Sequence, residues 1–122
     1  MKRVWVVVAV LLALPIGALW YMDGAEKQES QFKSYRDLQA SGLIEKGWVP
    51  EFIPRSAYEI HERHRVDVAG VNVAFRFSPG DVALVEAACT KQAGGPAYTC
   101  AHRSGVVKAT LSSDGSGRIV SE

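Results

Sequence analysis

The sequence predicts an α+β protein in which one N-terminal transmembrane helix precedes a small domain with a mainly antiparallel sheet and helices packed on one face. Three observations support this prediction. An uncharged run opens the chain, segments with alternating apolar residues fill its second half, and helix-start signals lie between them. About 100 residues follow the run, enough for one domain with a modest core.

The uncharged run extends over nineteen residues, from Val4 to Met22. As a helix it would span roughly 28 Å, close to the hydrocarbon thickness of a bilayer. Lys2 and Arg3 precede it and should stay in the cytoplasm. A cleaved secretory signal is the alternative, but the run is long for one and ends in Leu19-Trp20-Tyr21-Met22, without a small-x-small cleavage site. We therefore predict residues 1–22 as an uncleaved anchor, with the remaining domain periplasmic or extracellular.

Residues 23–31 are polar, without apolar periodicity, and are predicted as a juxtamembrane linker before an extracytoplasmic domain at 32–122. A helix is expected over 31–40, because Phe32, Tyr35 and Leu38 recur at near-helical spacing.

A rigid extended loop is predicted next, over 47–54, because Pro50 and Pro54 exclude a regular helix or a central strand. We call this segment the Pro-bounded loop. Ser56-Ala57-Tyr58-Glu59 matches a capping box and predicts a short helix to about His64.

Alternating apolar residues predict a strand over 66–77, with a change of phase around Ala69-Gly70. Ser78-Pro79-Gly80-Asp81 carries helix-start signals, so a helix is expected to about Lys91. Three further strands are predicted, at 97–103, 106–112 and 118–120.

The chain has two cysteines, Cys89 and Cys100, both in the predicted exported part. Outside the cytoplasm an even pair is most simply a disulfide. A redox pair is the alternative, but the spacing is not C-x-x-C and no neighbouring residue would lower a thiol pKa. We predict a structural disulfide.

Charge and motifs exclude several functions. The net charge is +1, with acids and bases interspersed, so no basic stripe exists to meet nucleic-acid phosphates. No G-x-S-x-G elbow or comparable motif places a nucleophile beside a base. We therefore predict no catalytic residues and no cofactor, and the expected partners are the membrane, through residues 4–22, and a protein in the envelope.

The cluster that most resembles a metal site is His61, His64 and Asp67. On the predicted helix the two histidines lie one turn apart and could reach one cation, with Asp67 as a third ligand. The alternative is that both histidines flank the buried stripe and form local hydrogen bonds. A metal-sensing or small-ligand-sensing domain remains the second functional hypothesis.

Large apolar side chains gather in the Pro-bounded loop at Trp48, Phe52 and Ile53. They either cover the core or form an exposed surface for a protein partner, since rigid aromatic groups lose little entropy on binding.

A resemblance rests on the segment Gly47-Trp48-x-Pro50-x-x-Ile53-Pro54-x-Ser56-Ala57-x-x-Ile60-His61-Glu62, and on Phe75-Arg76-Phe77 with Asp81 soon after. Over roughly 32–82 the chain resembles small bacterial envelope proteins with a YbbD-type head domain. The resemblance implies a membrane or lipid anchor joined to one small domain, and no particular activity. Such proteins often have His-Asp-x-Asp-Thr-Asn where this chain has His64-Arg65-Val66-Asp67-Val68-Ala69, so their acidic cluster is incomplete here. The function predicted first is a membrane-tethered, non-enzymatic envelope domain that binds another protein or supports an envelope assembly.

Overall fold

A computed structural model describes residues 27–65, 70–103 and 105–122 of the chain, together with residues 3, 7 and 9. Most of the predicted anchor and the predicted phase change at residue 69 therefore lie outside the described residues. None of the helices in the described part is long and apolar enough to span a membrane.

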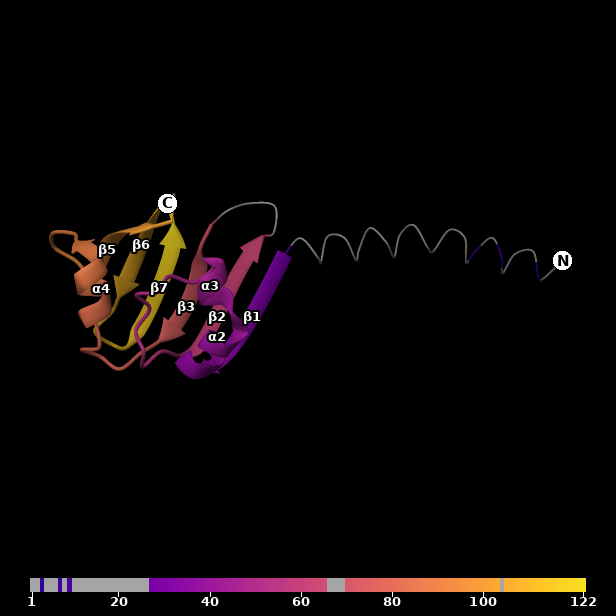
Figure 1. Cartoon of the computed structure of the whole chain (residues 1–122), viewed down its shortest axis with the longest axis horizontal. Helices are drawn as coiled ribbons and strands as arrows, with labels where there is room; N and C mark the ends of the chain where they lie inside the picture. Colours follow the sequence, from indigo (N-terminus) through magenta and orange to yellow (C-terminus); the bar gives the residue numbers. More distant parts are fainter. Residues whose placement is uncertain (1–2, 4–6, 8, 10–26, 66–69, 104) are drawn as a thin grey trace.

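The domain is built on one antiparallel sheet of seven strands in the order β1-β2-β3-β7-β6-β5-β4 (Figure 1). This confirms the mainly antiparallel sheet expected from the sequence. The strands are β1 Lys27–Ser34, β2 Tyr58–Arg65, β3 Asn72–Arg76, β4 Cys89–Lys91, β5 Ala97–His102, β6 Gly105–Leu111 and β7 Ser116–Ser121.

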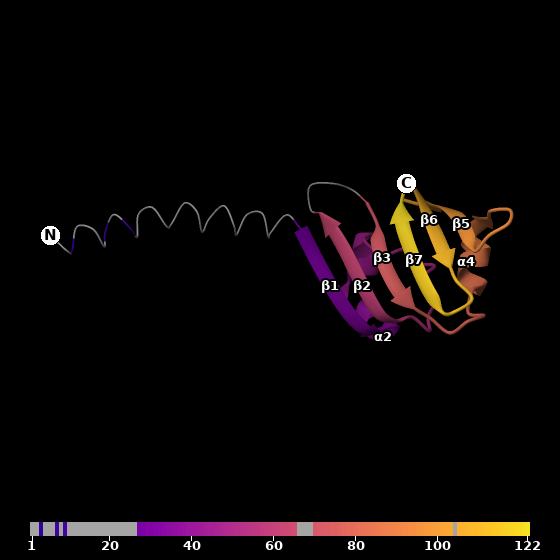
Figure 2. The same ribbon diagram turned by 180° about the vertical axis from the view of Figure 1, so that it is seen from behind.

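Three short helices lie on one face of the sheet, as Figures 1 and 2 show from opposite sides. They are α2 Tyr35–Ser41, α3 Leu43–Lys46 and α4 Ala83–Ala88. The core fills the space between the helices and the sheet. Its fully buried apolar members come from every part of the domain: Leu38, Val49, Ile53, Ile60, Val73, Val85, Ala109 and Ile119.

The first strand occupies a segment where the sequence suggested a linker and the start of a helix. β1 pairs with β2 along its whole length, and Phe32 lies opposite Ile60. The helix begins only at Tyr35, because the hydroxyl of Ser34 accepts a hydrogen bond from the Asp37 amide and caps it. The described part of the sheet therefore already includes Lys27, within the segment expected as a linker.

The helix predicted from Ser56 to His64 is wrong, because this segment forms strand β2. Buried Ile60 and Glu62 alternate with exposed neighbours, which is the two-residue period of a strand. Ser56 makes no capping box. Its hydroxyl accepts a hydrogen bond from the Ser78 amide instead, and its own amide donates to Asp81 Oδ2.

The second half of the chain follows the sequence prediction more closely. β5, β6 and β7 match the three strands expected from apolar alternation. The helix expected to run to Lys91 ends at Ala88, because Cys89 adopts an extended conformation and starts β4. Cys89 lies directly opposite Cys100 on β5, and the predicted disulfide joins them.

Candidate functional site

Local backbone hydrogen bonds shape the Pro-bounded loop at both ends. The Trp48 amide donates to Leu43 O at 3.0 Å, and the Ala57 amide donates to Pro54 O at 3.0 Å. Between them Ile53 is fully buried and Phe52 is 8% exposed. These two side chains therefore cover the core, and of the three residues considered as an interaction surface only Trp48 is half-exposed.

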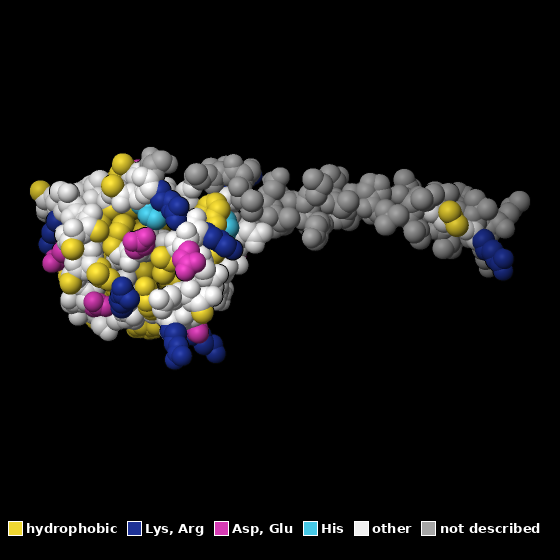
Figure 3. Space-filling view, viewed as in Figure 1, with side chains coloured by type: hydrophobic (Ala, Val, Ile, Leu, Met, Phe, Trp, Pro, Cys, Tyr) yellow, Lys and Arg dark blue, Asp and Glu magenta, His cyan; other side chains and the backbone are white. Residues whose placement is uncertain are grey.

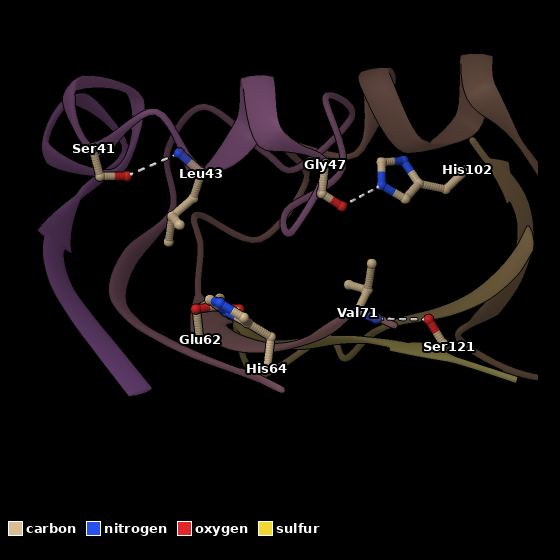
Figure 4. Close-up of polar contacts among 8 residues, drawn as sticks. All are labelled: Ser41, Leu43, Gly47, Glu62, His64, Val71, His102 and Ser121. Carbon is tan, nitrogen blue, oxygen red and sulfur yellow. Dashed lines mark hydrogen bonds and ion pairs between the residues drawn. The ribbon is translucent and has the colours of Figure 1, made fainter. Parts of the chain in front are cut away.

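Trp48 stacks on His64, with ring centroids 3.9 Å apart and an angle of 13° between the planes. His64 Nδ1 lies 2.6 Å from Glu62 Oε1 (Figure 4). Both polar side chains project from the face of β2 that packs beneath the helices, and Glu62 has no exposed surface. A row of Trp48, His64 and Glu62 thus runs from the loop into the core.

The carboxyl group of Glu62 is only half satisfied. Among the described residues its second oxygen, Oε2, is buried without a hydrogen-bond partner. Burial raises the pKa of the Glu62 carboxyl above its ordinary value, and the hydrogen bond and charge of His64 act against that shift. A buried acid of this kind holds its proton more strongly than a surface glutamate does.

The structure does not bring His61 and His64 together. They are three residues apart on a strand, so they point to opposite faces of the sheet: His61 is exposed and His64 packs inward. Asp67 lies outside the described residues. Within the described ranges no three side chains of the metal-binding types converge. The predicted cation site required His61 and His64 one helical turn apart, and the strand does not provide that arrangement.

A groove lies on the helix side of the domain. It has α3 and the Pro-bounded loop on one side and α4 on the other. Its volume is about 660 Å³. The apolar part of its lining consists of Ile44, Phe52, Leu84, Ala87, Ala88 and Ala101. Figure 3 views this side of the molecule and shows hydrophobic side chains gathered in its middle with acidic and basic groups around them.

Two hydrogen bonds fix the end of β5 to the α3 loop and so shape one wall of the groove. His102 Nε2 lies 2.9 Å from Gly47 O, and an Arg103 guanidinium nitrogen donates to Glu45 O at 2.7 Å. Glu51, Arg55 and Arg103 place charges of both signs on the lining. The sequence analysis missed Leu84 and Arg103, because only the tertiary fold brings them beside the Pro-bounded loop.

The fold and the groove define a small, disulfide-bonded α+β domain with a recessed apolar surface on its helix side. Residues 26–76 match the family model of the YbbD head domain. The match covers β1 to β3 with α2, α3 and the Pro-bounded loop, and it supports the resemblance seen in the sequence. Comparison with curated proteins and with solved structures finds no match.

Proposed function

We propose that this chain is a membrane-tethered, non-enzymatic envelope domain that binds another protein through the groove between α3, the Pro-bounded loop and α4. The observation that carries the proposal is the composition of the groove. Apolar residues from α3, the Pro-bounded loop, α4 and β5 line it, and Leu84 on α4 is 36% exposed. Burying such apolar surface against a partner is favourable.

The groove is also rigid, which lowers the entropic cost of binding. Pro50 and Pro54 are buried in the loop that forms one wall, and Arg103 and His102 fasten β5 to the α3 loop. Association is most favourable when few side chains and loops have to be ordered. The acidic Glu51 and the basic Arg55 and Arg103 would orient a partner that carries complementary charges.

The tether rests on the predicted anchor at residues 4–22. It would hold the domain in the periplasm or outside the cell, a compartment in which the Cys89–Cys100 disulfide is stable. Attachment to a membrane raises the effective concentration of the domain for neighbouring membrane or envelope proteins.

A photo-crosslinking amino acid placed at Leu84 tests the proposal in intact cells. We expect one protein adduct of defined mass from this position. The matched control is Val106, which is 46% exposed and lies outside the groove, and we expect no adduct of that mass there. Glu51→Lys should reduce the yield at Leu84, because it reverses a charge in the lining. Equal adducts from both positions, or none from Leu84, would contradict a binding groove.

A further inference from the structure

The side of the sheet that faces away from the helices bears a concentration of basic side chains. Residues paired directly across strands share a face, so Arg118 lies between Ala74 and Thr110 on this outer face. Lys108 lies opposite Val120, and Arg76 lies opposite Ser116. Figure 2 views the domain from this side, where no described helix covers the sheet.

Among the described residues, cations outnumber acids on this outer face. The register and exposure place six basic residues there: Lys33, Arg63, Arg65, Arg76, Lys108 and Arg118. The acids lie at its margins. Glu29 pairs with Arg63 at 3.3 Å, Glu59 and Asp114 lie near Arg76, and Glu122 follows the end of β7.

The helix side has no such excess. Its loops and helices, with the inward side of β4, carry five basic residues, Arg36, Lys46, Arg55, Lys91 and Arg103. They carry the same number of exposed or half-buried acids, Asp37, Glu45, Glu51, Asp81 and Glu86. The positive charge of the domain is therefore displaced toward the outer face of the sheet.

Between the basic side chains lie small residues, Ala74, Thr99 and Thr110. Tyr58 lies opposite Arg76 and is 40% exposed. Tyrosine and basic residues are the side chains that favour the headgroup region of a membrane. A sheet surface with this composition suits an extended anionic layer better than a single small anion.

The tether places such a layer within reach. The described part of the sheet begins at Lys27, so only residues 23–26 separate it from the predicted end of the anchor at Met22. Four residues extend at most about 14 Å. Electrostatic attraction acts over roughly 8 Å at physiological ionic strength, so the domain cannot move far beyond the field of the bilayer.

We propose that the outer face of the sheet docks on anionic phospholipid headgroups of the membrane that anchors the chain, with Arg118 and Lys108 at its centre. This inference rests on the tether of the proposed function. Docking in this orientation turns the helix side, and with it the groove, away from the bilayer and toward an envelope partner.

The test uses the full-length chain in nanodiscs of phosphatidylcholine, with or without phosphatidylglycerol. A fluorophore is attached through Thr110→Cys on the outer face or, as the matched control, through Ala87→Cys on α4. The native cysteines form a disulfide and remain unlabelled. Headgroup-attached quenchers should quench the label at position 110 only in discs with phosphatidylglycerol, and 0.5 M salt should abolish the effect. The label at position 87 should stay unquenched in both.

Removing the central cations should remove the lipid preference. Lys108→Gln with Arg118→Gln is expected to weaken docking by roughly fivefold per cation, while the disulfide and the circular dichroism spectrum stay unchanged. Equal quenching of the label at position 110 in both kinds of disc, or stronger quenching at position 87, would overturn the docking proposal. Neither result would contradict the membrane tether. If the chain does not insert into the nanodiscs, both the tether and the docking proposal are overturned. If the label at position 110 is shielded in native membranes but is not quenched in nanodiscs with phosphatidylglycerol, the outer face binds a macromolecule. That result would overturn lipid docking.

Discussion

The carboxyl group of Glu62 is fully buried, and within the described residues only one of its oxygens is hydrogen-bonded. An unsatisfied buried acceptor costs about 1–3 kcal/mol, and more when it is charged. The cost is lower when the carboxyl group is protonated, which is the physical reason for its raised pKa. Because the folded state binds this proton more strongly than the unfolded state does, Glu62 contributes stability at low pH and loses that contribution as the pH rises.

Glu62→Gln should therefore stabilise the domain at neutral pH. Below the ordinary pKa of glutamate, about 4.3, both the folded and the unfolded wild-type protein carry a neutral carboxyl group, and the substitution should change little. Above the raised pKa the wild-type protein buries an ionised group that glutamine lacks. We expect a gain of about 1 kcal/mol at pH 7–8 that fades toward pH 4, measured by urea unfolding across this range.

Glu51→Gln is the matched control, since Glu51 is exposed and should show little effect at any pH. A Glu62→Gln effect that is the same at pH 4 and pH 8 would contradict ionisation of the buried carboxyl as its cause.

The residues of the row Trp48, His64 and Glu62 differ in how well the sequence predicts their positions. Trp48 stands out because a large aromatic side chain in a Pro-bounded loop must either pack or bind. Glu62 could not be predicted as a core residue, because burying a glutamate costs the hydration free energy of its carboxyl group. Only the register of β2 with β1 and β3 places it opposite Ser30 and Val73, on the inward face.

Among the elements, the strands that the sequence predicts are those with clear apolar alternation. β6 is the best example, because Val107, Ala109 and Leu111 are buried at every second position. β1 is mostly polar, and its sequence KQESQFKS gives no such signal. Its conformation depends on pairing with β2, which lies more than twenty residues away in the chain. Local patterns cannot encode such a partner.

Two signals coincide around the start of β2 and make this segment resemble a helix in the sequence. Ser56 and Glu59 have the spacing of a capping box, and apolar Ala57 and Ile60 are three residues apart, which fits the period of a helix and not that of a regular strand. Pairing on both edges decides in favour of the strand, with an irregularity between Tyr58 and His61 where Glu59 adopts a positive φ of 46°.

The edge strand β4 is only three residues long, so pairing alone holds it weakly to the sheet. The disulfide joins β4 to β5 across eleven residues of sequence. Replacing Cys89 and Cys100 together by serine should lower the free energy of unfolding by roughly 3 kcal/mol in the chain-entropy model. Thermal or urea unfolding of the full chain measures this loss.

Reduction of the wild-type protein serves as the control, since it should produce a similar loss without a substitution. The native protein should also resist thiol alkylation until it is reduced. Rapid labelling of the untreated protein would contradict the bridge.

For the molecule as a whole, the two sides of the sheet differ in cover and in charge. The helix side holds the groove, and the outer side carries the excess of cations. The composition alone concealed this difference, because interspersed charges and a net charge of +1 imply no polarity. The sheet register separates the charges, and it follows from pairings between distant strands.

The proposed tether predicts that the full chain stays with membranes after carbonate extraction, because nineteen uncharged residues are long enough to span the bilayer core. Intact-mass measurement should find the N-terminal segment retained. Deleting residues 4–22 should release the chain into the soluble fraction. A mature N-terminus after residue 22 would show cleavage and would exclude the anchor.

The position of β7 determines when the domain can assemble. It lies between β3 and β6, yet it follows both in the sequence. Until Ser116–Ser121 emerges from the ribosome or from a translocation channel, the strands on either side lack the partner that joins them into one sheet. Without β7 the described strands divide into two three-stranded groups, β1-β2-β3 and β4-β5-β6, each with an open edge that β7 covers in the complete sheet. The seven-stranded sheet therefore forms only after β7 has joined the two halves.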